Sequence, residues 1–415
     1  MVSIARKNLL EDIPRFLVAQ AGIMFAATLV TIQTGILDGF TRSTVLLIEG
    51  SNADVWVASE KMENLEETEP LLMGQVEQAS LIQGVKQAEA LIIGSVRWRT
   101  LDGVLNPVRL VGFEPGGELF QPGKLLKGER AAVEQPYTVI MDETRLDELM
   151  VEKIGDTATV ASLPVTIGGI TQDSQSLVSP PFLFSSLENI NTYINSGLKI
   201  ELNCKMLEGA EDLRCTKVYE KSETEEKLAT PPTKPLSLTD PITYILIGAE
   251  PGQDLETLKQ RLEASLPGTR AYTRAEMAAK TATYWKDRTG VGIILGLGAA
   301  MGVIVGMVVV SQILYASVSD HIKEFGTLKA MGASDGMIYG VVIEQSLWMA
   351  VIGYLPAMLI CLGVSSWAAT KGIIIFITPV GALGVLGIVI AMCVASGILA
   401  IQKVTHVDPA IVFKA

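Results

Sequence analysis

Residue types that commonly do chemistry are scarce in this sequence of 415 residues. It contains two histidines, His321 and His406, and no H-E-x-x-H, G-x-S-x-G or C-x-x-C pattern. Residues 117–124 approach the glycine-rich loop that binds nucleotide phosphates, but Glu118 stands where that pattern has glycine and Leu125 where it has serine or threonine. The sequence therefore predicts no catalytic residue, no metal site and no ATPase within this chain.

Cysteines are the other reactive side chains, and four are present. Cys204 and Cys215 are 11 residues apart in a polar stretch that we expect to be a loop. In an oxidising compartment they could form a disulfide worth roughly 2–3 kcal/mol. Two free thiols are the alternative, and a zinc site is disfavoured because no histidine lies nearby. Cys361 and Cys393 fall in apolar stretches, where we expect small apolar side chains.

The segment from Ser319 to Gly340 lies between two long apolar stretches. An apolar residue recurs at every third position, which predicts a short amphipathic helix: Ile322, Phe325, Leu328 and Met331. Gly332 and the Ser334-Asp335 pair then predict the end of this helix and the start of another. Because the short helix adjoins two apolar stretches, a partner that binds it could move both. A helix that merely lies on lipid headgroups is the alternative.

Apolar stretches set the overall class of the protein. The mean hydropathy is +0.37, 19% of the residues are charged, and the net charge is −12, which argues against nucleic-acid binding. A hydrocarbon core of about 30 Å takes ~20 helical residues, and backbone groups in lipid must be hydrogen-bonded within their own segment. The sequence therefore predicts four transmembrane helices, at residues 16–37, 289–319, 336–370 and 372–402.

Basic residues flank these helices on one side, which places that side in the cytoplasm. Arg6 and Arg15 precede the first helix, Lys323 and Lys329 lie between the second and third, and Lys403 follows the fourth. Residues 1–15, a coupling helix at 320–335 and a tail at 403–415 are then cytoplasmic, whereas 38–288 lie outside. A cleavable signal peptide is the alternative for the first helix, but its apolar core is long for one.

The segment between the first two helices is acidic, with 25 basic and 38 acidic side chains in residues 38–289. It alternates strand and helix signals, which predict small sheets packed with helices. The expected strands are 54–57, 90–98, 108–113, 137–141, 156–160, 164–170, 182–184 and 244–247, and the expected helices are 142–149, 186–194 and 254–266. We expect residues 60–69, with five glutamates, to be a solvated helix face or turn, and 221–241 to be a flexible loop.

The fold class that follows is an α-helical membrane protein with four transmembrane helices plus a large α+β extracytoplasmic domain inserted between helices 1 and 2. Within the second helix, glycines recur at every fourth position and favour close contact with a dimer partner or another helix: Gly298, Gly302 and Gly306. That stretch has 31 uncharged residues, about 46 Å of helix, and could project as a stalk into the outer domain. Pro356 and Pro379 predict kinks in the third and fourth helices.

One short segment also carries a resemblance to a known family. Its sequence resembles the coupling helix of the FtsX-like permeases, a superfamily that includes MacB, LolC, LolE and FtsX: Lys323, Glu324, Phe325, Gly326, Thr327, Leu328, Lys329, Ala330, Met331, Gly332 and Ala333. The ends of the chain, residues 5–9 and 407–413, are similar to the family's opening K-N-L and its closing V-x-P motifs. Residues 52–57 are similar to the strand that begins the outer domain of MacB-like and DevC-like members.

The resemblance implies a permease of the bacterial inner membrane with its large domain in the periplasm. It implies coupling residues from Ile322 to Gly332, a second permease copy or paralogue, and separate ABC ATPase subunits that bind ATP and Mg. Because only about fifteen residues precede the first helix, we expect the ATPase to be another polypeptide. The chain would transmit movement outward and, with a periplasmic adaptor, export a lipid, glycolipid, peptide or drug-like substrate. Two alternatives are lipoprotein release and regulation of a cell-wall hydrolase.

Overall fold

The computed structural model describes residues 12–100, 102–196, 199–206, 213–220, 233, 235–320, 327, 334–369 and 375–404. The chain forms two compact units. One comprises Arg42–Trp285, and the other comprises Met1–Thr41 together with Lys286–Ala415.

The first unit is built on a ten-stranded sheet with the order β14-β1-β13-β3-β4-β9-β6-β8-β5, in which β7 also pairs with β3 and β8. The strands are β1 (Val55–Ser59), β3 (Val85–Arg99), β4 (Leu105–Phe113), β5 (Lys124–Gly128), β6 (Thr138–Asp142), β7 (Thr157–Val160), β8 (Leu163–Gln172), β9 (Phe182–Ser186), β13 (Tyr244–Ala249) and β14 (Thr269–Thr273). Two small sheets pair β2 (Leu71–Leu72) with β12 (Pro241–Ile242), and β10 (Lys199–Met206) with β11 (Leu213–Glu220).

The long strand β3 joins the two halves of the large sheet. Its first half, from Val85 to Leu91, pairs with β13, and its second half, from Ile92 to Arg99, pairs with β4. The prediction of small sheets is wrong for most of this unit, because β3, with 15 residues, is long enough to pair with different neighbours along its length and so joins ten strands into one sheet. The sequence signal marked only the second half and part of the first.

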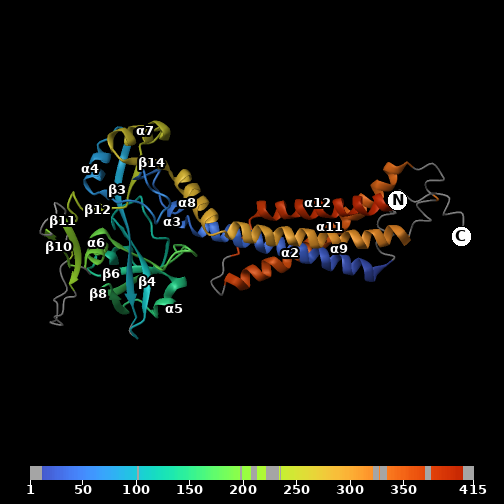
Figure 1. Cartoon of the computed structure of the whole chain (residues 1–415), viewed down its shortest axis with the longest axis horizontal. Helices are drawn as coiled ribbons and strands as arrows, with labels where there is room; N and C mark the ends of the chain where they lie inside the picture. The colour runs from blue at the N-terminus through green and yellow to red at the C-terminus, as the bar shows by residue number, and fades with distance from the viewer. Residues whose placement is uncertain are drawn as a thin grey trace. The chain divides into compact units, whose positions relative to one another are not determined.

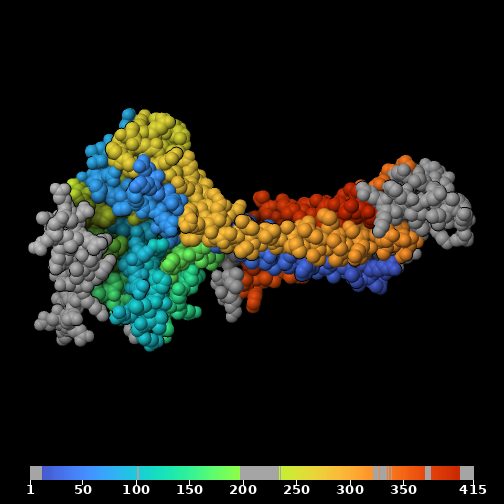
Figure 2. All heavy atoms as spheres, viewed as in Figure 1, coloured from blue at the N-terminus to red at the C-terminus, as the bar shows by residue number. Residues whose placement is uncertain are grey.

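Helices cover both faces of this sheet. They are α3 (Leu46–Glu49), α4 (Gly74–Ser80), α5 (Leu146–Leu149), α6 (Leu187–Asn195), α7 (Leu255–Ser265) and α8 (Arg274–Arg288), with 3-10 turns η1 (Arg130–Glu134) and η2 (Glu143–Arg145). Figure 1 shows α4 and α6 on one side and α3 and α8 on the other, and α7 shares one apolar core with α4 and α6. In Figure 2, α7 and the start of α8 (yellow) lie beside the segment from β1 to α4 (blue).

The alternating side chains of β1 show why both faces are buried. Val55 and Val57 belong to one apolar core with residues of α4, α6 and α7, whereas Trp56 belongs to a second core with residues of α3 and α8. Successive strand residues point to opposite faces, so a strand that is apolar at every position is typical of a sheet covered on both sides. The domain is therefore three layers thick.

The acidic segment at residues 60–69 contains the expected turn, and four of its five glutamates are exposed, whereas Glu66 is not. The Glu66 side chain is 6% exposed, and one of its oxygens accepts a hydrogen bond from Arg109 Nε at 2.6 Å, while the other contacts Ser179 Oγ. Glu67 accepts a hydrogen bond from the Tyr284 hydroxyl at 2.7 Å. The prediction of solvated glutamates is wrong for Glu66, because Arg109 and Ser179, which are distant in the sequence, bind its carboxylate.

The second unit contains four helices long and apolar enough to cross a membrane: α2 (Ile13–Ser43), α9 (Val291–Asp320), α11 (Asp335–Ala369) and α12 (Pro379–Val404). Figure 1 shows them running alongside one another. Their shared core includes Ile23, Val310, Met349 and Val389. Pro356 lies inside α11. The predicted kink at Pro379 is wrong, because this proline is the first residue of α12 and the helix begins there rather than at residue 372.

Candidate functional site

Most of the predicted coupling helix, Ile322 to Gly332, lies outside the described residues. Within it Thr327 is described, in helical conformation and exposed. The flanking elements are well defined: α9 ends at Asp320, and α11 begins at Asp335, directly after Ser334. The assignment of these residues to ATPase coupling stays a prediction, and the structure describes what holds the two ends of the segment.

A small apolar cluster packs the end of α9 against α11 and α12. Val318, Val342 and Ile401 are 2%, 0% and 1% exposed, and Tyr339 and Val341 pack against them. Ser346 Oγ, one turn further along α11, donates to the Val342 carbonyl at 2.8 Å. Because the end of α9 and the start of α11 share this cluster, a displacement of the segment between them would act on both helices.

An ion pair joins the same end of α9 to the start of α2. The Arg15 guanidinium contacts the Asp320 carboxylate, and Arg15 Nε lies 2.9 Å from Asp12 Oδ2. These side chains are about half exposed, so solvent screens the pair and it contributes little to stability. From the sequence, Arg15 indicated only the membrane topology. An acidic residue at the end of one span and a basic residue at the start of another could have suggested the pair.

The glycine stripe of α9 lies against α2 of the same chain. A methyl group added at Gly298 would come 2.5 Å from Gln33 Nε2, one at Gly302 would come 2.7 Å from Leu29 Cδ2, and one at Gly306 would come 2.7 Å from Ala26 Cβ. At the next contact the glycine is on α2 and the larger residue is on α9: a methyl group added at Gly22 would come 2.6 Å from Val309 Cγ1. Small residues therefore bring the two helices close together along four successive contacts.

Polar contacts also cross this helical unit. Ser396 Oγ of α12 donates to the Met307 carbonyl of α9 at 3.0 Å, and the Tyr354 hydroxyl of α11 donates to the Ala382 carbonyl of α12 at 2.8 Å. Cys361 and Cys393 are buried and free, in keeping with their expected role as small side chains. Interhelical hydrogen bonds of this kind fix the register of apolar helices.

The predicted disulfide residues lie in strands, not in a loop. Cys204 is on β10 and Cys215 on β11, and the antiparallel register places the two residues directly opposite each other. The expectation of a polar loop is wrong, because β10 and β11 pair with each other as antiparallel strands. The disulfide itself stays a prediction.

A buried charged cluster lies in the outer domain. Glu89 is 1% exposed, and its Oε1 accepts hydrogen bonds from the backbone amides of Glu118 and Leu119 at 2.7 and 3.1 Å. Arg130 donates to the carbonyls of Gly117 and Phe120 at 2.8 and 3.0 Å. Burial raises the pKa of the neighbouring Glu114, and the Glu89 charge adds to this rise.

This cluster holds the loop around Gly117 and does not resemble a catalytic site. A methyl group at Gly117 would come 2.4 Å from Glu89 Oε2, so glycine is needed for the close approach. Among the side chains that the structure describes, no group of three or more His, Cys, Asp or Glu residues is arranged to hold a metal ion. The arrangement can orient a loop, and it offers no nucleophile beside a base.

Comparison with known proteins matches both parts of the chain. The family model of the MacB-like periplasmic core domain matches residues 16–265, and that of the FtsX-like permease C-terminal region matches residues 296–409. A curated relative, the macrolide export ATP-binding/permease protein MacB of Hyphomonas neptunium, is 26% identical over 142 residues. That alignment covers 34% of this chain and 22% of the relative, so the chain spans about a fifth of the relative's length.

Two solved structures are also similar. The extracellular domain of the noncanonic ABC-type transporter YknZ from Gram-positive bacteria aligns with a TM-score of 0.34 and 10% identity, covering 54% of this chain and 100% of that one. The periplasmic region of MacB from Actinobacillus actinomycetemcomitans aligns with a TM-score of 0.33 and 12% identity, covering 55% and 92%. Because the periplasmic-core match spans more than half of the chain and the permease match follows it, the chain belongs to the FtsX-like permeases with a MacB-like periplasmic core domain, which are transmembrane components of ABC transporters.

Proposed function

We propose that this chain is the membrane-spanning permease subunit of a MacB-like ABC exporter of the bacterial inner membrane. Separate ATPase subunits would bind ATP and Mg, and a second permease copy or paralogue would complete the membrane part. The observation that supports this most directly is the order of the two family matches along the chain, residues 16–265 and then 296–409, around four apolar helices.

The proposed mechanism is mechanotransmission through residues 322–332. When the ATPase pair closes on ATP, it would shift this segment and with it the adjoining ends of α9 and α11. The cluster of Val318, Val342 and Ile401 supports this route, because a packed apolar contact transmits a displacement better than a loose one. The movement would reach the outer domain through α9, which follows α8 after Gly290.

The proposed substrate is a lipid, glycolipid, peptide or drug-like molecule handled on the outer side with a periplasmic adaptor. The core of the helical unit supports this view, because most of its buried side chains are apolar, Ala19, Ala27 and Ala357 among them. The buried polar side chains that the structure describes there are fewer: Gln20, Thr31, Gln345, Ser346 and Ser396. A polar substrate crossing between the helices would need polar side chains lining its path. Energy supplied inside would therefore act on a substrate that never enters this bundle.

The test is co-purification of the tagged full-length chain with vanadate-sensitive ATP hydrolysis from its own host. Replacing Phe325, Leu328 and Met331 together by Asp should lower the hydrolysis that co-purifies at least tenfold, because the apolar face that binds the ATPase would be charged. Leu81→Asp is the matched control, since Leu81 is 87% exposed in the outer domain. If ATPase recovery is equal for the triple variant and the control, coupling through this helix is wrong.

A further inference from the structure

One buried carboxylate holds residues 114–120, the loop after β4 that we call the Gly117 loop. Glu89 of β3 is 1% exposed, and its Oε1 accepts hydrogen bonds from the backbone amides of Glu118 and Leu119. Its other oxygen, Oε2, is buried and has no hydrogen-bond partner among the residues that the structure describes. Buried carboxylate oxygens normally accept a hydrogen bond. Oε2 can therefore accept one that none of the described contacts supplies.

Glu114 is the side chain that can supply this hydrogen bond. It begins the Gly117 loop, and its Oε1 accepts a bond of 3.3 Å from the amide of Ala90, the residue after Glu89. Burial raises the pKa of Glu114, and the charge of Glu89 raises it further. A protonated carboxyl is the form that burial favours, and it is also a hydrogen-bond donor. Glu118, the other acid of the loop, is exposed.

Arg130 is the cation that the structure places beside this pair of acids. Its Nη2 donates to the carbonyls of Glu114, Gly117 and Phe120 at 3.4, 2.8 and 3.0 Å, so it binds the backbone of the Gly117 loop at three points. The charges of the cluster balance when Glu89 is ionised and Glu114 is protonated. Ionisation of Glu114 adds a negative charge that the cluster does not compensate.

The Gly117 loop also holds residues 51–54, which follow α3 and lead into β1. Asn52 donates to two carbonyls of the loop, one bond from its backbone amide and one from its side chain, both at 2.8 Å. The Arg274 side chain, at the start of α8, donates to the Ser51 carbonyl at 2.8 Å. In the sequence α2 precedes residues 51–54 and α9 follows α8. Both connections to the apolar helices therefore meet at residues 51–54.

We propose that Glu89 and Glu114 share one proton, and that this proton controls how firmly the Gly117 loop holds residues 51–54. While Glu114 is protonated, its hydroxyl donates to Glu89 Oε2 and the loop keeps Asn52 in place. When Glu114 releases the proton to solvent, Oε2 loses its donor, two negative charges face each other, and the loop loosens. Because burial raises the folded-state pKa of Glu114, the firm state is complete at acidic pH and is lost as the pH rises through that pKa. This regulation goes beyond the proposed export function and does not depend on ATP.

The first test detects the shared proton by infrared difference spectroscopy of the full chain in lipid nanodiscs. As the pH is raised from about 5, where most carboxyl groups are already ionised, the carbonyl band of a protonated carboxyl should disappear. Glu114→Gln should remove this band. Glu89→Gln removes the neighbouring charge, so the band should disappear at lower pH than in the wild type. Glu118→Gln makes the same change at the exposed acid of the loop and should leave the band unchanged.

The second test measures the hold on residues 51–54 by amide hydrogen exchange. Wild type and Glu114→Gln are compared at the same pH, so the intrinsic pH dependence of exchange cancels in the ratio of their rates. For residues 51–54 and 117–120 we expect a wild-type to variant ratio near one at acidic pH, rising at least about threefold at alkaline pH. The ratio for β8 should stay constant.

Three outcomes would overturn the proposal. A ratio for residues 51–54 that does not change with pH would show that the proton does not control the loop, and an equal change in β8 would show that the effect is not local. A spectrum in which Glu114→Gln removes no carboxyl band would show that another donor, such as a water molecule, serves Glu89 Oε2. All of these measurements omit nucleotide, so a failure of ATP coupling cannot affect them.

Discussion

Single residues in the outer domain show how burial changes chemistry without producing a catalyst. Glu89, Glu114 and Arg130 lie together, and their polar atoms mainly contact backbone groups of the loop that follows β4. Glu114 Oε1 accepts a long hydrogen bond of 3.3 Å from the Ala90 amide, which compensates only partly for its burial. Ionisation of Glu114 therefore destabilises the folded domain, by an amount that depends on pH.

Replacing Glu114 by Gln should remove this destabilisation of the folded domain. Burial raises the folded-state pKa of Glu114 above its unfolded value, so the wild-type chain loses stability as the pH rises through the folded pKa. The variant lacks this loss, because an amide oxygen can still accept from Ala90 and carries no charge. Thermal unfolding of the purified chain should show a larger gain for the variant at pH 7 than at pH 4. Glu118→Gln, at an exposed position, is the control, and an equal gain at both pH values would contradict the prediction.

Elements in the helical unit are held by close backbone approach. Gly302 and Gly306 of α9 face Leu29 and Ala26 of α2, and Gly22 of α2 faces Val309 in return. The sequence predicted that the glycine stripe of α9 contacts either a dimer partner or a neighbouring helix. In the structure this stripe packs against α2 of the same chain. The two helices are antiparallel along this contact, because rising positions on α9 meet falling positions on α2.

Gly306→Val should separate α9 from α2 and α12. A Cβ at this position would lie 2.7 Å from Ala26 Cβ and 2.6 Å from Met392 Sδ, and overpacking of this kind costs about 1–3 kcal/mol. We expect a lower unfolding temperature in detergent. Gly296→Val makes the same change where nothing among the described residues lies within 4 Å of the added Cβ, and it should have little effect. Equal destabilisation by both variants would contradict the packing role.

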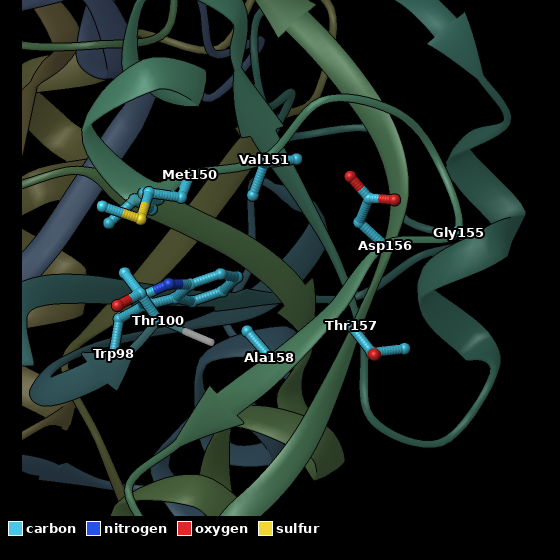
Figure 3. A pocket seen from close by; sticks show the side chains of 9 residues that line it. Trp98, Thr100, Met150, Val151, Gly155, Asp156, Thr157 and Ala158 are labelled. Atoms are coloured by element: carbon cyan, nitrogen blue, oxygen red, sulfur yellow. The ribbon is translucent and has the colours of Figure 1, made fainter. Parts of the chain in front are cut away.

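The whole chain folds into two compact units of different structure. The unit of Arg42–Trp285 carries the sheet and a cavity of about 230 Å³ beside Trp98 (Figure 3), whereas the unit of Met1–Thr41 and Lys286–Ala415 carries the apolar helices. The sheet unit interrupts the helical unit in the sequence, after α2 and before α9. If α2 and α9 both cross the membrane, the sheet unit and the segment between α9 and α11 must lie on opposite sides.

Cysteine labelling can test this topology in intact cells. In a chain with Cys204 and Cys215 replaced by Ser, a membrane-impermeant maleimide should label Leu81→Cys from outside, because Leu81 is 87% exposed in the sheet unit. Thr327→Cys should be labelled only after the membrane is opened. The remaining native cysteines, Cys361 and Cys393, are buried and supply the background control. Labelling of Thr327→Cys in intact cells would refute the proposed orientation.

Local patterns determined a large part of this protein. Uninterrupted apolar runs are sufficient to predict long helices, because lipid leaves the backbone no other way to satisfy its hydrogen bonds. Ser186 and Asp254 were expected at helix starts, and both cap their helices by accepting from a backbone amide three residues later. The motif around residues 322–332 indicated the family from a handful of side chains, which the matches over residues 16–265 and 296–409 support.

Tertiary structure decided what depends on residues that are distant along the chain. The two-part pairing of β3 and the Glu66–Arg109 contact join segments whose local sequence carries no record of one another. The cavity beside Trp98 likewise arises only when β3, α5 and β7 come together. Composition and residue spacing determine the conformation that each segment prefers. A cavity or an ion pair depends on which segments become neighbours, and only folding brings them together.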